Sequence, residues 1–243
     1  MIRPFVIGLA LLAASPAAAQ GSGSPVTFSG EASVVSQYRF RGVSQSDEDP
    51  ALQGSLTVSR GGFYAGAFAS TVNGFGEKGG ADAEVDLYAG YRTDLGGGFN
   101  LDGGLLYYAF PGSEGGDFGF FEPYASLSGT LGPVTATLGA AYAPDQAALA
   151  GDNLYLRADL DGAVPFTPVT VRAHLGRSTG AGTPFTPAAD YTDWSIGADY
   201  VLGPATLGLR YVDTDLSGAQ ARASGATGDI VDAAIVASAS VRF

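Results

Sequence analysis

Hydrophobic and polar residues alternate at every second position along most of this chain, in short runs separated by polar, glycine-rich segments. Successive residues of a β-strand point to opposite faces, so each run predicts a strand with one apolar face. Residues 231–243 show the pattern best, and their opposite face is mostly polar. The apolar face of this run consists of Val231, Ala233, Ile235, Ala237, Ala239, Val241 and Phe243.

About twelve such runs follow one another, and no helical pattern or second sheet is visible that would cover their apolar faces. The predicted strands span residues 26–41, 52–59, 63–72, 84–92, 99–108, 119–131, 134–142, 154–160, 169–175, 193–202, 206–211 and 231–243. The pattern does not decide which face of residues 63–72 is apolar. A closed barrel can turn apolar faces to lipid and polar faces to a lumen without any other element to cover them.

The connections between these runs alternate between short and long. Tight turns are predicted at residues 60–62, 96–98, 132–133, 162–168 and 203–204, and longer polar loops at 42–50, 73–80, 111–117, 143–152, 178–190 and 215–228. Short periplasmic turns, long outer loops and an even strand number are typical of bacterial outer-membrane barrels. A two-sheet sandwich has no reason to alternate in this way. We therefore predict an all-β, transmembrane antiparallel up-and-down β-barrel of about 12 strands with both termini in the periplasm.

The N-terminus predicts export. Arg3, an apolar run over residues 5–14 and the small residues Ala17, Ala18 and Ala19 form a secretory signal peptide. We expect residues 1–19 to be removed and residues 20–243 to form the barrel, located in the outer membrane of a Gram-negative bacterium. Without Arg3, 11 basic residues remain against 24 acidic ones, a net charge of −13. No later stretch approaches the about 18 consecutive apolar residues of a membrane-spanning helix.

Composition agrees with a barrel and narrows the chemistry. The chain has 37 Gly, 12 Tyr and 14 Phe, which suit a twisted closed sheet with aromatic girdles, and no Cys. The lack of cysteine excludes disulfides and cysteine-based metal sites.

One segment resembles a known family. Residues 38–54, YRFRGVSQSDEDPALQG, followed by FYAGAFAST at 63–71, are similar to the N-terminal signature of the TorF family of proteobacterial outer-membrane porins. The matching positions are Tyr38, Phe40-Arg41-Gly42, Ser44-Gln45, Pro50-Ala51, Gln53-Gly54 and Tyr64-Ala65-Gly66. The resemblance is close over the first strand pair and extends elsewhere to length, strand rhythm and the terminal Phe243. It implies an outer-membrane barrel and little more about function.

Charged residues fall on the polar face of most predicted strands. The candidate pore-lining residues are Arg39, Arg41, Glu84, Asp86, Arg92, Asp102, Glu122, Arg157, Asp159, Arg172, Asp199 and Arg210. Two interpretations follow from a near-balanced interior. Opposed charges across a narrow aqueous constriction would filter solutes by charge and dipole, whereas cross-strand ion pairs would simply fill the barrel.

The loops predict an acidic mouth. Asp47, Glu48 and Asp49 form a run in the first long loop, and further carboxylates lie in or near the other long loops, at Glu77, Glu114, Asp117, Asp145, Asp152, Asp190, Asp213, Asp215 and Asp229. This acidic crown should concentrate cations at the mouth, which predicts a modest cation preference or a preference for neutral polar solutes. Alternatively, the acidic groups only keep the surface soluble or bridge divalent cations to lipopolysaccharide.

Two features of the ends of the barrel carry further predictions. Arg39 and Arg41 either hold an anionic solute group at the mouth or pair with Asp47 or Glu48 and pin the first loop inward. The terminal Phe243, after Val241-Arg242, resembles the signal by which the barrel assembly machinery recognises its clients, and it is also an interfacial aromatic anchor.

Other function classes have weaker support. An outer-membrane hydrolase needs a Ser-His pair at the lipid face, but the only histidine, His174, falls on the polar face, so we predict no enzyme. We expect no cofactor and no metal centre built on His or Cys, and the acidic balance argues against nucleic-acid binding. The predicted partners are outer-membrane lipid, lipopolysaccharide, the assembly machinery and small solutes. The sequence therefore predicts a porin-like barrel that forms a narrow passive channel, with a plugged structural or adhesion barrel as the alternative.

Overall fold

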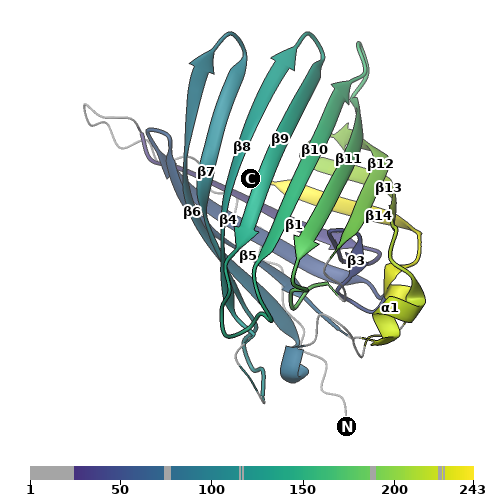
Figure 1. Ribbon diagram of the computed structural model, residues 1–243. Coiled ribbons are helices and arrows are strands. Elements are labelled where there is room, and N and C mark those ends of the chain that lie inside the picture. Colours follow the sequence, from purple (N-terminus) through teal and green to yellow (C-terminus); the bar gives the residue numbers. More distant parts are fainter. Residues whose placement is uncertain are drawn as a thin grey trace.

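A computed structural model describes residues 25–73, 78–114, 116, 118–186, 190–223, 226 and 228–243. The predicted signal peptide, Glu77 and Asp117 lie outside the described residues. Twelve antiparallel strands form a closed barrel in which each strand pairs with its neighbours in the chain and β1 pairs with β14 (Figure 1). The fold predicted from alternation is confirmed.

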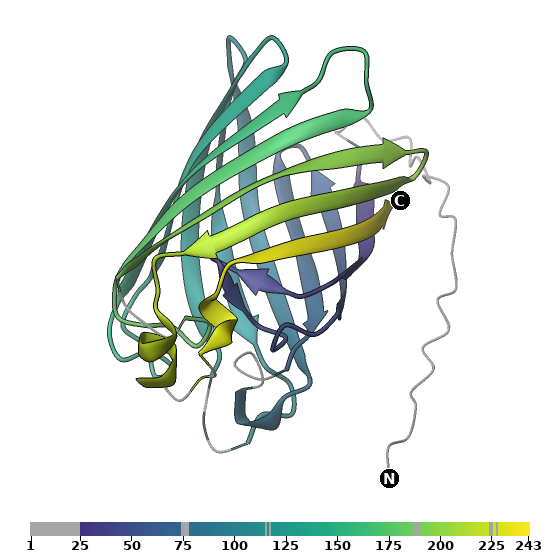
Figure 2. The ribbon, with the colours of Figure 1, turned by 90° about the vertical axis from the view of Figure 1, so that its right-hand side faces the viewer.

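The wall is continuous from β1 to β14. Its strands are β1 (Thr27–Val35), β4 (Ala51–Arg60), β5 (Phe63–Thr71), β6 (Ala83–Gly96), β7 (Phe99–Ala109), β8 (Phe120–Leu131), β9 (Val134–Ala143), β10 (Asn153–Ala163), β11 (Val169–Gly180), β12 (Tyr191–Leu202), β13 (Ala205–Thr214) and β14 (Ala234–Arg242). Short turns connect the strands at one end and long loops at the other, as predicted. The loop end also carries η2 (Lys78–Gly80), α1 (Gly218–Ala223) and η3 (Asp229–Val231), and Figure 2 shows α1 beyond the strand ends.

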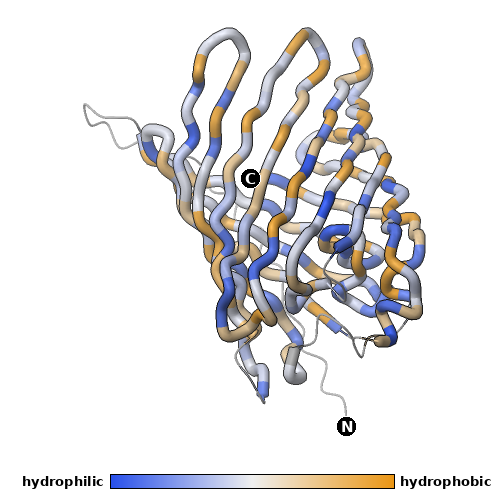
Figure 3. The backbone as a smooth tube through the Cα atoms, viewed as in Figure 1, coloured by the Kyte–Doolittle hydropathy of each residue, from blue (hydrophilic) through white to orange (hydrophobic). Residues whose placement is uncertain are grey.

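Large apolar side chains point outward along every wall strand. Phe28 is 72% exposed, Leu138 64% and Ile235 65%, and the alternation of apolar and polar positions is visible along the strands in Figure 3. An exposed apolar surface that surrounds the whole wall is suited to lipid rather than to water. None of the helices in the described ranges is long and apolar enough to cross a membrane.

The structure shows which face of β5 points outward, a question that the sequence pattern left open. On β5, Phe63 is 67% exposed on the outside, whereas Ser70 is buried on the inside. Tyr64, Gly66 and Phe68 share the inner face with Ser70, because side chains alternate along a strand.

Two strand boundaries differ from the prediction. The first strand ends at Val35 rather than at residue 41, and the chain then folds into the barrel as a tiny hairpin of β2 (Arg39–Phe40) and β3 (Val43–Ser44). The alternation over residues 26–41 predicts Tyr38 and Phe40 on the lipid face, opposite Arg39 and Arg41, but both lie inside. The last strand begins at Ala234 rather than at residue 231, because Val231 belongs to η3 and is buried in the loop-end core. Alternation alone does not distinguish a wall strand from a short hairpin that follows it, because the same apolar and polar alternation continues through both.

The apolar core of the molecule sits inside the loop end. Three clusters lie around the hairpin, and the smallest contains Tyr38, Ala51 and Val72. Of the other two, the first contains Ala81, Tyr108, Phe110, Phe120, Ala143, Leu149 and Phe185, with Phe40 packed against it. The second contains Val43, Tyr191, Leu216, Ala221, Ile230 and Val231. Residues 36–50 are here called the inner loop, and this arrangement holds their buried part inside the barrel, whereas residues 47–50 are exposed.

Candidate functional site

The inner loop leaves the wall immediately after β1 and crosses the lumen. Its turn uses left-handed backbone at Arg41 (φ 46°) and Gly42 (φ 83°). A Cβ atom at Gly42 would overlap Thr214 and lie 2.9 Å from the Cβ of Asp193. Only glycine allows the loop to approach the wall this closely.

Tyr38 fastens the inner loop to one side of the wall. Its hydroxyl donates a hydrogen bond to Glu84 Oε1 on β6 at 2.9 Å, and both residues are buried. Burial, followed by the charges of Glu84 and Asp86, raises the pKa of the Tyr38 hydroxyl far above its ordinary value. Tyr38 is therefore a neutral donor at any physiological pH.

Arg41 reaches another part of the wall. Its Nη2 lies 2.7 Å from Glu122 Oε2 on β8, and both side chains are at least nine-tenths buried. The guanidinium also lies 4.0 Å from the centroid of the Tyr155 ring on β10. Burial is the largest single influence and lowers the Arg41 pKa, but the charge of Glu122, the hydrogen bond to it and the neighbouring Tyr108 and Tyr191 together outweigh burial and raise the pKa above its ordinary value. A buried ion pair of this kind is costly to break from one side.

Arg39 holds the loop to the last strand connection. Its Nη1 donates to the carbonyl oxygens of Ile230 at 2.9 Å and Asp232 at 3.0 Å. Its Nη2 lies 3.3 Å from Glu48. Burial lowers the pKa of Arg39, and the charge of Glu48 opposes that shift. The pairing of Arg39 with Glu48 and the inward position of the first loop match the structural role predicted for this arginine.

Aromatic side chains close the space between the inner loop and the long loops. The Phe40 ring centroid lies 4.4 Å from that of Phe185 and 5.9 Å from that of Tyr108. Gln45 donates from its amide to the carbonyl oxygen of Phe185 at 2.9 Å. The hairpin thus constricts the loop end of the lumen.

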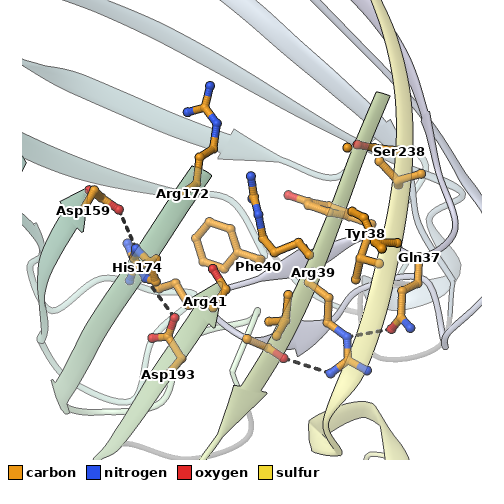
Figure 4. Close-up of a pocket in the computed structure, with 18 of the residues that line it drawn as sticks. Gln37, Tyr38, Arg39, Phe40, Arg41, Asp159, Arg172, His174, Asp193 and Ser238 are labelled. Atoms are coloured by element: carbon orange, nitrogen blue, oxygen red, sulfur yellow. Dashed lines mark hydrogen bonds and ion pairs between the residues drawn. The ribbon is translucent and has the colours of Figure 1, made fainter. Parts of the chain in front are cut away.

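A polar cavity of about 630 Å³ lies against the inner loop. Its walls come from the hairpin and from the inner faces of β10 to β14, and Figure 4 shows its side chains. His174 is held between two carboxylates, with Nδ1 2.6 Å from Asp159 and Nε2 3.1 Å from Asp193. The Tyr155 hydroxyl lies 2.9 Å from the same Nε2. Both ring nitrogens are therefore occupied, and among the described residues no serine hydroxyl forms a hydrogen bond with the ring.

The charged residues predicted to line a pore lie mostly on the inner wall. Arg172 bridges Asp161 at 2.7 Å and Asp199 at 2.5 Å, and Arg157 pairs with Asp159. Arg210 lines the same cavity and is exposed, without an ion pair to any described residue. Arg172 therefore forms cross-strand pairs and Arg157 forms a pair within β10, and the role of these groups in conduction stays a prediction.

Three carboxylates are buried in the wall around the inner loop. Glu84, Asp86 and Glu122 lie on β6 and β8, and Glu122 accepts from the Tyr108 hydroxyl at 2.9 Å as well as from Arg41. Within the described ranges, no group of three His, Cys, Asp or Glu residues is arranged to hold a metal ion. These residues were predicted as pore lining, but the structure buries them against the hairpin.

Arg92 and Asp102 form a separate pair on β6 and β7 toward the short-turn end. The guanidinium donates from Nε at 2.9 Å and from Nη2 at 2.5 Å to the same carboxylate oxygen of Asp102. At the opposite end, Asp47, Glu48 and Asp49 are exposed beyond the hairpin. Charged residues therefore lie in three zones along the barrel: the acidic rim at the loop end, the cavity beside the inner loop, and the Arg92–Asp102 pair toward the short turns.

Phe243 closes the barrel seam. Its backbone N and O pair with the O and N of Gly30 at 3.0 and 2.8 Å, and its ring covers Gly30 on the outside of β1. This position agrees with an interfacial anchor, and its role as an assembly signal stays a prediction.

Sequence reasoning missed the hairpin and its aromatic partners. One signal was available, since residues 26–41 exceed the about 9–11 residues that a tilted spanning strand needs. The residues beyond that length begin close to the point after Val35 where the chain turns into the barrel. The contacts of Phe185 and Tyr155 carry no such signal, because their partners are distant in the chain.

The comparisons with known proteins agree with the fold. A family model described as "Bacterial protein of unknown function (Gcw_chp)" matches residues 19–243. No curated protein matches the sequence. The TorF name suggested by the signature is not part of these matches and stays a prediction.

Several solved structures are similar in fold at low identity. The NanC porin has a TM-score of 0.56 at 14% identity and covers 89% of this chain and 99% of its own. The KdgM porin, in complex with disordered oligogalacturonate, has a TM-score of 0.57 at 8% identity and covers 88% and 98%. The COG4313 outer membrane channel from Pseudomonas putida F1 has a TM-score of 0.54 at 11% identity and covers 94% and 98%. These neighbours are porins and channels.

Proposed function

The chain belongs to the Gcw_chp family of bacterial proteins of unknown function, and we propose that it forms a narrow passive channel in the outer membrane of a Gram-negative bacterium. The observation that carries the proposal is the polar cavity between the inner loop and the charged wall of β10 to β14. The apolar outer wall supports a lipid environment, and the porin fold of the neighbours supports the same class of protein. Residues 1–19 act as the signal peptide, and Phe243 directs assembly.

The solutes we propose are small and polar. Arg39 and Arg41 are committed to the wall and to Glu48, so the mouth offers no free arginine pair from the hairpin to an anion. The exposed acidic crown lies outside the constriction, where it attracts cations over a screening length of about 8–10 Å. We therefore expect a modest preference for cations over anions. Lipopolysaccharide, bridged by divalent cations to the same carboxylates, is a proposed partner of this surface.

Single-channel recording of the refolded protein in a planar bilayer tests the proposal. Discrete conductance steps, with a reversal potential that favours cations in a salt gradient, are expected. A folded barrel that never conducts would contradict it.

One observation favours a second candidate, a plugged structural barrel. Val43, Ser44 and Gln45 have no exposed surface, and two apolar clusters fill the loop end around them. A barrel of this size can be filled by its own side chains. Conductance that appears only after removal of the inner loop would support this candidate over the open channel.

Deletion of Phe243 tests the proposed assembly signal. Without the terminal ring, we expect the protein to accumulate in the periplasm and its outer-membrane yield to fall. An unchanged yield, measured by membrane fractionation, would contradict that role.

A further inference from the structure

Four wall strands, β5 to β8, carry an unusual row of residues on their inner face near the short turns. Tyr64 pairs in register with Gly90, Gly90 with Gly104, and Gly104 with Tyr124. Directly paired positions share a face, so two tyrosines flank two glycines across the lumen side of the wall. One step toward the loops, Gly66 is paired with Tyr88 in the same way.

The tyrosine rings lie along the wall over these glycines. A Cβ atom at Gly90 would lie 2.5 Å from Cζ of Tyr64, and one at Gly104 would lie 2.5 Å from the hydroxyl oxygen of Tyr124. At Gly66 the hydroxyl oxygen of Tyr88 would be 2.6 Å away. Each tyrosine ring thus occupies the space that a side chain at the paired glycine position would need. One ring face packs on backbone, and the half-buried tyrosines keep surface toward the lumen.

The hydroxyl groups of these rings are held in place. Those of Tyr64 and Tyr124 lie 2.6 Å apart, and Tyr64 also donates to Asp102 Oδ1 at 2.5 Å. Arg92 fixes the other oxygen of Asp102 with two hydrogen bonds. The Tyr88 hydroxyl lies 2.6 Å from that of Thr57 on β4. The aromatic surface is therefore rigid before any solute arrives, which reduces the entropy lost on binding.

A second cavity, of about 690 Å³, opens beside this surface at the short-turn end. It is lined by Tyr64 and Tyr88 and, on β1 and β4, by hydroxyl side chains at Thr27, Ser29, Thr57 and Ser59. Ligand sites of small molecules typically enclose about 300–1,000 Å³. The size suits a ligand of one to a few rings.

Aromatic faces beside many hydroxyl groups match the chemistry of a sugar. A pyranose ring has an apolar C–H face that packs on an aromatic ring, and edge hydroxyls that exchange hydrogen bonds with Ser and Thr. The charges of this cavity are Arg92, which is neutralised by two bonds to Asp102, and Arg60, the exposed last residue of β4. We propose that Tyr64 and Tyr88 form a binding surface for a neutral saccharide, with Tyr124 holding the hydroxyl group of Tyr64 in place. This proposal names the solute class of the channel and rests on the proposed function, although binding can be measured without conduction.

Isothermal titration calorimetry of the full barrel in detergent, with maltotriose as the probe, tests the surface. We expect saturable binding that weakens about fivefold or more when Tyr64→Ala removes one ring. Gly90→Val keeps Tyr64 but takes the space its ring occupies, and it should weaken binding as well. Tyr200→Ala is the matched control, because Tyr200 is 46% exposed on the outside of β12, and it should bind as the unaltered protein does. The heat-dependent mobility of each variant on a gel verifies the folded barrel.

Several results would overturn the proposal that this surface binds a saccharide. These are an unaltered protein that gives no binding heat, a folded Tyr64→Ala variant that binds maltotriose as well as before, or a control that loses as much affinity. Tighter binding of trigalacturonate than of maltotriose would overturn the assignment of a neutral ligand. Planar-bilayer recording separates this proposal from the channel. A barrel that does not conduct but still binds maltotriose would contradict only the proposed channel. A barrel that conducts but gives no binding heat would contradict only the proposed saccharide surface.

Discussion

Arg41 shows how one residue's role depends on its surroundings. On the polar face of a strand it would have been a mobile charge at the rim of a pore. In the structure it is buried, paired with Glu122 and stacked on Tyr155. A guanidinium satisfies this position because its planar fork serves a carboxylate while its face packs on an aromatic ring. The residue therefore acts as an anchor of the inner loop.

Replacement of this anchor should loosen the loop. In Arg41→Gln the buried Glu122 loses its cationic partner, and we expect a loss of about 3 kcal/mol in the free energy of unfolding. Urea unfolding in detergent measures it, and conductance should rise as the loop detaches. Arg242→Gln is the matched control, because Arg242 pairs with Glu31 at 2.5 Å with a side chain 69% exposed. Its loss should be at most about 1 kcal/mol. Equal effects of the two substitutions would contradict the anchoring role.

Gly30 is a second position where one atom matters. A Cβ there would lie 2.6 Å from the Phe243 ring, which must then leave the wall at the seam between β1 and β14. We expect Gly30→Ala to lower the stability of the barrel by about 1 kcal/mol, measured as a lower urea midpoint. Gly54→Ala, also on the outer face, meets only Glu31 O at 3.5 Å and should be close to neutral. A neutral Gly30→Ala would show that the ring does not stabilise the seam.

At the scale of elements, the inner loop breaks the up-and-down pattern of the described wall strands, because it carries a hairpin inside the barrel. Its hairpin contacts β6, β8, β10 and the β13–β14 connection through Tyr38, Arg41 and Arg39. Wall strands can be read from a local period of two residues. The destination of the loop depends on partners far along the chain, of which Glu122 is 81 residues from Arg41.

Replacement of residues 37–49 by a short glycine-serine linker should open the loop end. The wall pairing of β1 with β4 does not use these residues, so we expect the barrel to fold and its single-channel conductance to increase. A matched replacement of the exposed residues Asp145 and Ala147 in the β9–β10 loop by glycine and serine leaves the hairpin in place and should change conductance little. Unchanged conductance after removal of the inner loop would show that the constriction lies elsewhere.

At the scale of the whole molecule, charge is separated along the barrel axis. Exposed carboxylates gather at the loop end, whereas the described arginines of the interior are mostly paired with carboxylates. The field at the mouth is therefore negative, while the lumen is close to neutral. Such a field selects ions through their local concentration, and salt screens it.

Neutralisation of the rim tests this field. The triple substitution Asp47→Asn, Glu48→Gln and Asp49→Asn should move the reversal potential toward zero in a salt gradient, and more at low than at high ionic strength. The conductance at high salt should stay nearly the same, since the inner wall is unaltered. An unchanged reversal potential would show that the interior sets ion preference.

The sequence by itself determined the barrel. Period-two alternation, twelve runs and alternating connection lengths are local properties, and all three are found in the twelve wall strands, β1 and β4 to β14. Only the tertiary structure decided which charges pair, where residues 36–50 go and that Tyr64 and Tyr124 meet over two glycines. The physical reason is range. The face of a strand residue follows from its immediate neighbours in the chain, whereas its partner across a lumen follows from the closure of all twelve strands.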